Sequence, residues 1–129
     1  MKKLAHIALV VDDYDRAISY YTEVLGFALV QDEALTETKR WVLVSPGEDS
    51  CQFLLAKAVG DVQQQAIGNQ SGGRVFLFLH TDTFEEDHAR LLQHGVEIVR
   101  GPVEEPYGKV LVFKDLYGNL WDLIQPVSS

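Results

Sequence analysis

The feature of this sequence that most limits its possible folds is an internal repeat. In each half, hydrophobic periodicity predicts a strand, a helix and three further strands. The first half places these elements at 4–11, 12–26, 27–30 with a few residues more, 40–45 and 52–56; the second places them at 74–81, 83–94, 96–99, 109–114 and 119–125. Gly26 and Gly95 stand 69 residues apart, as do Asp13 and Asp82, and Val30 and Val99. Shared order and shared spacing indicate a duplicated β-α-β-β-β module.

The repeat also predicts how the chain is organised. One module occupies about 1–56 and the second about 74–129. Between them, residues 57–73 carry three consecutive glutamines and a glycine-rich stretch, which is typical of a connector, with a one-turn helix around 62–67 as an option. We therefore expect one α+β domain, 1–129, built from two modules.

Composition narrows the function classes. The 129 residues are 47% hydrophobic and 23% charged, the profile of an ordinary globular domain. The net charge of −8 argues against nucleic acid and anionic membranes as partners, because the only basic clusters are Lys2-Lys3 and Lys39-Arg40. The single cysteine cannot form an internal disulfide. The first apolar run contains His6 and lacks a cleavage pattern, so we expect no targeting segment and a cytoplasmic location.

Polar residues inside otherwise apolar strands are the candidate site. They are His6, Gln52 and Asp122, and a shift of 70 residues aligns Gln52 with Asp122, while a shift of 69 aligns His6 with Val75. Three of four equivalent positions thus carry groups that can share a divalent ion. The plainer alternatives stay open: a histidine satisfied within the core or at an edge, and an aspartate on the solvent face of an edge strand.

The sequence resembles a known family at both ends. The opening KLAHIALVVDDYDRAISYYTEVLGF and the closing GKVLVFKDLYGNLWDLIQP are similar to the vicinal oxygen chelate superfamily, the group of glyoxalases, bleomycin-resistance proteins and extradiol dioxygenases. The resemblance covers essentially the whole chain. It implies a glyoxalase-like fold in which two βαβββ modules form an open, eight-stranded, barrel-like sheet around a cleft. It also implies metal ligands at His6, Gln52, Val75 and Asp122, and valine cannot ligate a metal.

The resemblance implies two functions from different classes. One is a metal-dependent lyase or dioxygenase, in which His6, Gln52 and Asp122 hold Ni, Zn, Mn or Fe against a small substrate with adjacent oxygens. The base that moves the proton is then Asp122 or a metal-bound hydroxide. The other is a metal-free binding protein, like the bleomycin-resistance members, that sequesters an aromatic or planar small molecule. Expected ligand contacts are Arg40, Trp41, Tyr107 and Phe113, although core packing is the commoner role of an aromatic side chain. The resemblance also implies a homodimer.

Overall fold

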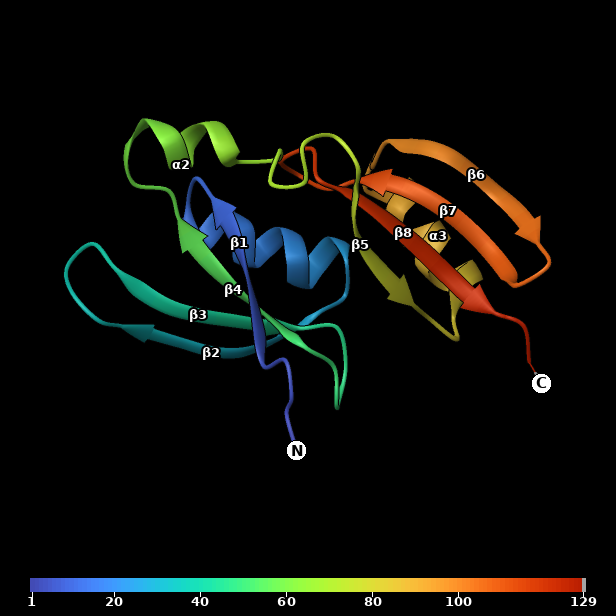
Figure 1. Ribbon diagram of the computed structural model, residues 1–129, viewed down its shortest axis with the longest axis horizontal. Helices are drawn as coiled ribbons and strands as arrows, with labels where there is room; N and C mark the ends of the chain where they lie inside the picture. The colour runs from blue at the N-terminus through green and yellow to red at the C-terminus, as the bar shows by residue number, and fades with distance from the viewer. Residues whose placement is uncertain (129) are drawn as a thin grey trace. The chain divides into compact units, whose positions relative to one another are not determined.

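The repeat is visible directly in the fold. The structure, a computed structural model, describes residues 1–128 and divides into two compact units, Met1–Ile67 and the part that begins at Gly68 (Figure 1). Each unit is a β-α-β-β-β module with its own four-stranded mixed sheet. The boundary between the units falls inside the predicted connector. Among the described residues, none of the helices has the length and apolar character needed to cross a membrane.

The first unit holds four strands and three short helical segments. In chain order these are β1 (His6–Val11), α1 (Tyr14–Ser19), the π-helical segment η1 (Tyr20–Val24), β2 (Ala28–Ala34), β3 (Arg40–Ser45), β4 (Gln52–Lys57) and α2 (Gly60–Ala66). The sheet order is β1-β4-β3-β2, with β1 and β4 parallel and the other pairs antiparallel. The predicted one-turn helix in the connector is present as α2.

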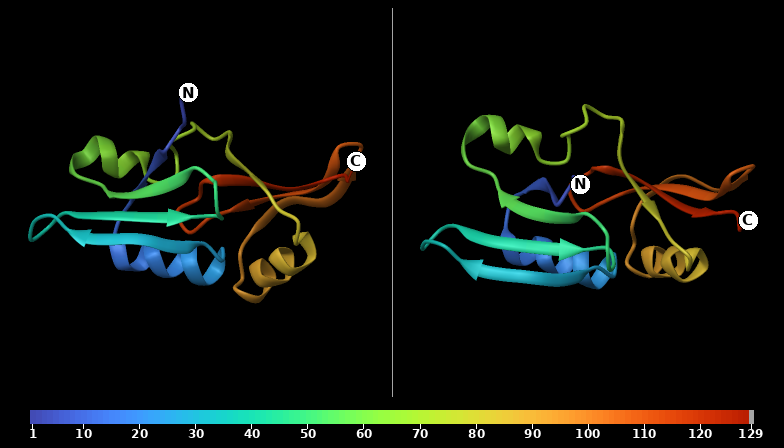
Figure 2. Two further views of the ribbon diagram at one scale, coloured as in Figure 1. Left: turned by 90° about the horizontal axis from the view of Figure 1, so that it is seen from below. Right: turned by 60° about the horizontal axis from the view of Figure 1, so that its bottom comes forward.

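The helix α1 begins and packs as its sequence predicts. Asp13 caps it, because its carboxylate accepts a hydrogen bond of 2.8 Å from the backbone N–H of Arg16. Ala17 of α1 and Tyr21 of the following segment η1 are fully buried against one face of the sheet, where Leu9 of β1 and Leu55 of β4 are also fully buried. Figure 2 shows α1 lying along this face. Alternation along the strands turns the remaining side chains to the other face, called here the far face.

The second unit repeats this plan with a longer helix. Its elements are β5 (Val75–His80), α3 (Phe84–Gln93), β6 (Ile98–Glu105), β7 (Gly108–Lys114) and β8 (Leu120–Pro126), and the sheet order is β5-β8-β7-β6. Phe84 and Leu91 of α3 are buried, as are Phe113 and Trp121, whose rings stack with centroids 6.0 Å apart. The far face of this sheet is the one turned away from α3.

Backbone irregularities recur at equivalent residues of the two units. The β2–β3 pairing shifts register between Leu29 and Gln31, and the β6–β7 pairing shifts between Ile98 and Arg100. The extra residues are therefore Val30 and Val99, the pair that the 69-residue spacing aligns. Strand β6 runs on to Glu105, beyond the predicted end at Val99, because further register shifts between Arg100 and Val103 accommodate Gly101 and Pro102 within the strand.

One buried carboxylate organises the hairpin between β7 and β8. Asp115 is 5% exposed and accepts hydrogen bonds of 3.0–3.1 Å from three successive backbone N–H groups, those of residues 117, 118 and 119. Its second oxygen accepts from the Asn119 amide and from the Trp121 indole N–H, each at 3.0 Å. The turn DLYGN is thereby fixed to the core, and β8 leaves it with Trp121 facing α3.

Candidate functional site

The predicted residues His6 and Gln52 are neighbours in the first sheet. They form a register pair at the start of the parallel strands β1 and β4, and both lie on the far face. The His6 ring meets Trp41 of β3 edge-on, with centroids 6.1 Å apart. The structure therefore brings three predicted site residues, His6, Gln52 and Trp41, to one face of the first unit.

The strands β3 and β4 separate beyond this point and form a fork. β3 pairs with β2 as far as Arg40, and β4 pairs with β1 as far as Lys57, but β3 and β4 pair with each other only at Leu43–Leu54 and Val44–Phe53. Figure 1 shows β4 turning away from β3. In the second unit the equivalent strands β7 and β8 pair along their whole length, from Gly108–Pro126 to Lys114–Leu120. The fork is thus a difference between the two repeats.

A pocket of about 610 Å³ occupies the fork, and it is called here the fork pocket. Its wall comes from the end of the β2–β3 loop, the first residues of β3, the second half of β4, the start of α1, the segment that leads into α2 and α2 itself. The lining residues are Tyr14, Thr38, Lys39, Arg40, Trp41, Leu54, Leu55, Ala56, Lys57, Ala58, Val59 and Gln63. This volume is within the range of pockets that hold small organic ligands.

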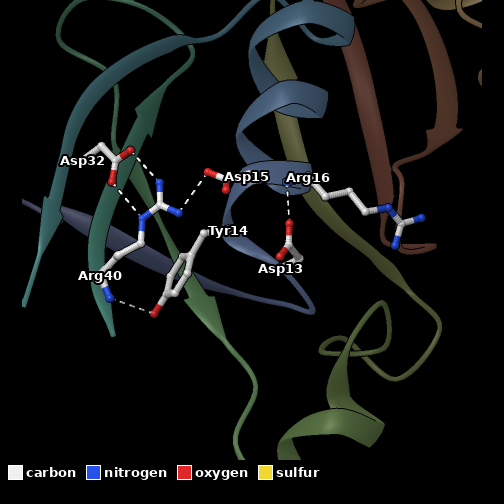
Figure 3. A network of polar contacts seen from close by, with 6 residues as sticks. All are labelled: Asp13, Tyr14, Asp15, Arg16, Asp32 and Arg40. Atoms are coloured by element: carbon white, nitrogen blue, oxygen red, sulfur yellow. Dashed lines mark hydrogen bonds and ion pairs between the residues drawn. The ribbon is translucent and has the colours of Figure 1, made fainter. Parts of the chain in front are cut away.

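Arg40 is held in place by its own network on the α1 side of the sheet (Figure 3). Its guanidinium forms a bidentate pair with Asp32, at 2.6 and 3.1 Å, and donates to Asp15 at 2.9 Å. It also lies 5.1 Å from the centre of the Tyr14 ring, whose hydroxyl accepts a hydrogen bond from the Arg40 backbone N–H. The bonds to Asp32 and then Asp15 raise the pKa of Arg40 further above its ordinary value. Arg40 lines the pocket, but its charge is already balanced.

The third candidate ligand, Asp122, lies on the far face of the second sheet. It pairs in register with Phe78 of β5, which is 65% exposed. Its Oδ1 atom is buried and, within residues 1–128, has no hydrogen-bond partner. Burial raises the pKa of the Asp122 carboxyl above its usual value, and the positive charge of Arg100 opposes this in part.

Strand pairing corrects the predicted alignment of Gln52 with Asp122. Leu43 lies two residues before the end of β3, and Val112 lies two residues before the end of β7. Leu43 pairs with Leu54, whereas Val112 pairs with Asp122. The residue equivalent to Asp122 is therefore Leu54, and Gln52 lies two residues earlier in its strand. Sequence comparison missed this because both final strands are uniformly apolar around the polar residue.

The residue His80 of β5 also lies on the far face of the second sheet. Simple alternation from Val75 places His80 on the face towards α3. The pairing of β5 with β8 shifts register between Val75 and Leu77, so Val75, Phe78 and His80 are opposite Leu120, Asp122 and Ile124, which share the far face. His80 is exposed there, on the same face as Asp122.

The donor set fits a divalent metal poorly. At the four equivalent positions stand His6, Leu54, Val75 and Asp122, and two of these side chains are hydrocarbon. Within either unit, over the part of the chain that the structure describes, no three His, Cys, Asp or Glu side chains gather to hold an ion. Gln52 adds only a neutral amide oxygen beside His6.

The other two predicted ligand contacts lie in the second unit. Phe113 is 1% exposed and stacks on Trp121, so it is a core residue, which corrects the prediction that its ring contacts a ligand. Tyr107 is 52% exposed at the turn between β6 and β7. Ten of the twelve lining residues, all except Arg40 and Trp41, were absent from the prediction. Alternation from Gln52 identifies two of them, Leu54 and Ala56, on the far face. Lys57 lies at an odd offset from Gln52, so it follows only from the fork, which the sequence does not show.

Comparison with known proteins gives the family. The chain is 53% identical over 126 residues to an uncharacterised protein of Shewanella frigidimarina, covering 96% of this chain and 93% of the relative. The solved structure of TnmS3, an antibiotic binding protein from Streptomyces sp. CB03234, is 28% identical with a TM-score of 0.77, covering 98% of each chain. UcmS2 is 30% identical with a TM-score of 0.80, covering 96% of this chain and 98% of its own.

The match to a family model extends over residues 3–123, nearly the whole of both units, and the model describes the glyoxalases, bleomycin-resistance proteins and dioxygenases. The predicted α+β class with two βαβββ modules is confirmed by the strand order and by the structures of TnmS3 and UcmS2. The chain belongs to the Glyoxalase/Bleomycin resistance protein/Dioxygenase superfamily.

Proposed function

We propose that this protein binds a planar or aromatic small molecule in the fork pocket and needs no metal to do so. The observation that carries the proposal is the fork itself, which opens about 610 Å³ in the first unit at strands that remain paired in the second. Trp41, Leu54 and Ala56 supply an apolar wall for a flat ring system. A structural relative that is an antibiotic binding protein supports this reading.

A variant that fills the pocket tests the proposal. Ala56 is half-buried in the pocket wall, so Ala56→Trp places an indole in the fork without removing any core side chain. We expect the wild-type protein to bind the neutral planar dye N-phenylnaphthylamine with one-to-one stoichiometry, followed by dye fluorescence, and Ala56→Trp to lose that binding.

The matched control is Ala28→Trp, which adds the same side chain to the exposed edge strand β2, outside the pocket. This variant should bind the dye as the wild type does. Equal binding by the wild type and Ala56→Trp, with both proteins folded by circular dichroism, would overturn the proposal.

A second candidate function is the metal-dependent lyase or dioxygenase, and one observation favours it. The buried Oδ1 of Asp122 has no hydrogen-bond partner among residues 1–128, as is expected of a carboxylate that awaits a cation. Asp122 and His6 are then the residues to hold the ion, with Gln52 as a weak third donor, and Ni, Zn, Mn and Fe are the metals to test.

Metal content decides between the two candidates. The protein is purified without chelators and analysed by plasma mass spectrometry, then titrated with each metal by calorimetry. Stoichiometric metal that is lost in both His6→Ala and Asp122→Ala would establish the metal site, whereas dye binding that survives both substitutions in metal-free protein supports the binding function.

A further inference from the structure

The polar groups around the fork pocket share one property. No Asp or Glu is among the lining residues, although the chain has 19 acidic residues against 11 basic ones. Three basic residues, Lys39, Arg40 and Lys57, line it instead. The pocket is therefore a locally basic site in an acidic protein.

Two of these three positive charges are not neutralised. Arg40 is balanced by Asp32 and Asp15, as described above. Lys39 and Lys57 form no ion pair with any residue in the described range 1–128, and both side chains are exposed. Lys39 directly precedes β3 and Lys57 ends β4, so the two residues belong to the two strands that bound the fork.

The neutral polar groups of the wall add hydrogen-bond donors. The Gln63 side-chain oxygen already accepts from the Val59 backbone N–H at 2.9 Å, which leaves the Gln63 NH₂ as the group available to a ligand. The half-buried Trp41 carries an indole N–H, which can only donate. Flat apolar side chains together with ammonium, amide and indole donors match a flat molecule that carries a negative charge.

We infer that the ligand of the fork pocket is a planar or aromatic anion, a carboxylate, sulfonate or ionised phenol, whose charged group is held by Lys39 and Lys57. The inference rests on the proposed function, since it names the class of ligand for the same pocket. It runs against the net charge of −8, which by itself favours cationic ligands. The nearby charges of Lys39 and Lys57 determine which ligand charge the pocket prefers, because salt limits the field of distant carboxylates to about 8–10 Å.

Two dyes that share one ring system but differ in charge test the inference about ligand charge separately from the proposed function. Anilinonaphthalene sulfonate is an anion, and N-phenylnaphthylamine is its neutral counterpart. We expect the wild-type protein to bind the anion about tenfold more tightly at about 0.1 M salt, and this preference to shrink as the salt is raised towards about 1 M.

Removing the two charges gives the sharper test. The double variant Lys39→Gln/Lys57→Gln should lose about tenfold in affinity for the anionic dye and keep its affinity for the neutral dye. The control Lys2→Gln/Lys3→Gln changes the net charge equally at residues that do not line the pocket, so its affinities should remain those of the wild type.

The outcomes are distinguishable. If both dyes bind with equal affinity, or if the two double variants weaken the anion equally, the pocket binds small molecules but the inference about charge is wrong. If neither dye binds, or if Ala56→Trp does not affect the binding, the proposed function fails and the inference fails with it.

Discussion

Two carboxylates in one hairpin show how much the surroundings of a residue determine its role. Asp115 accepts hydrogen bonds from three backbone N–H groups, the Asn119 amide and the Trp121 indole, whereas Asp122, seven residues later, has a buried oxygen that receives none within residues 1–128. Asp122 is conspicuous in the sequence because a charged residue interrupts an apolar strand. Asp115 falls between the predicted strands 109–114 and 119–125, where polar residues are expected, and its burial is a tertiary effect.

Removal of the Asp115 carboxylate should destabilise the fold. Asp115→Ala leaves three backbone N–H groups, the Asn119 amide and the Trp121 indole without their acceptor, so we expect a loss of about 3 kcal/mol in the free energy of unfolding. Urea denaturation followed by tryptophan fluorescence measures this. The exposed Asp82 serves as control, and Asp82→Ala should change stability by less than about 0.5 kcal/mol. Equal effects of the two variants would show that the network contributes nothing specific.

The raised pKa of Asp122 predicts a pH dependence with a definite sign. A carboxyl whose pKa is higher in the folded state favours folding when it is protonated, and this contribution is lost as pH rises through the folded-state pKa. We therefore expect Asp122→Asn to be more stable than the wild type at neutral pH, and the difference to vanish below pH 3.8, the ordinary value of the group. Denaturant unfolding at several pH values checks this. A variant less stable than the wild type at pH 7 would mean that the ionised carboxylate has a stabilising partner.

At the scale of elements, the sequence allowed the strands to be located but not the fork between two of them. The bounds of β3 were predicted to the residue, and those of β4 to within one residue, because alternation and flanking turn residues mark strands locally. Whether two neighbouring strands stay paired depends also on the contacts that each strand makes with other elements of the fold. Here β3 is held to β2 and α1 through the Arg40 network, while β4 follows β1.

The two acidic partners of Arg40 should contribute unequally to that arrangement. Asp32 makes a bidentate contact and its side chain is 31% exposed, whereas Asp15 makes a single contact and is 81% exposed. We expect Asp32→Asn to lower the free energy of unfolding by about 1 kcal/mol and Asp15→Asn by less than about 0.5 kcal/mol. Thermal and urea unfolding give both values. The reverse order would mean that the link to α1, rather than the link within the hairpin, fixes Arg40.

At the scale of the whole molecule, duplication made the fold predictable and made the site harder to predict. Equivalent glycines, bulges and helices confirm that the two halves follow one plan. The same assumption of equivalence misaligned Gln52 with Asp122, since a repeat predicts what two copies share and says nothing about how they differ. The fork, Leu54 and the bulge that turns His80 are all differences between copies.

Self-association is the prediction that belongs to this scale. Membership of the superfamily leads us to expect a homodimer. Sedimentation equilibrium at several protein concentrations should give twice the chain mass, with dissociation on dilution if the dimer is weak. A single monomer mass over the whole concentration range would contradict it.

The full pairing of β7 with β8 bears on which substitutions the fold tolerates. Within residues 1–128, each strand pairs only with strands of its own unit. A change in the pairing of β3 with β4 therefore leaves the sheet of the second unit complete. Substitutions at the fork thus leave the β7–β8 pairing of the second unit unchanged. Substitutions at positions 39, 54, 56 and 57, which line the pocket, are expected to change ligand preference while the second sheet stays intact.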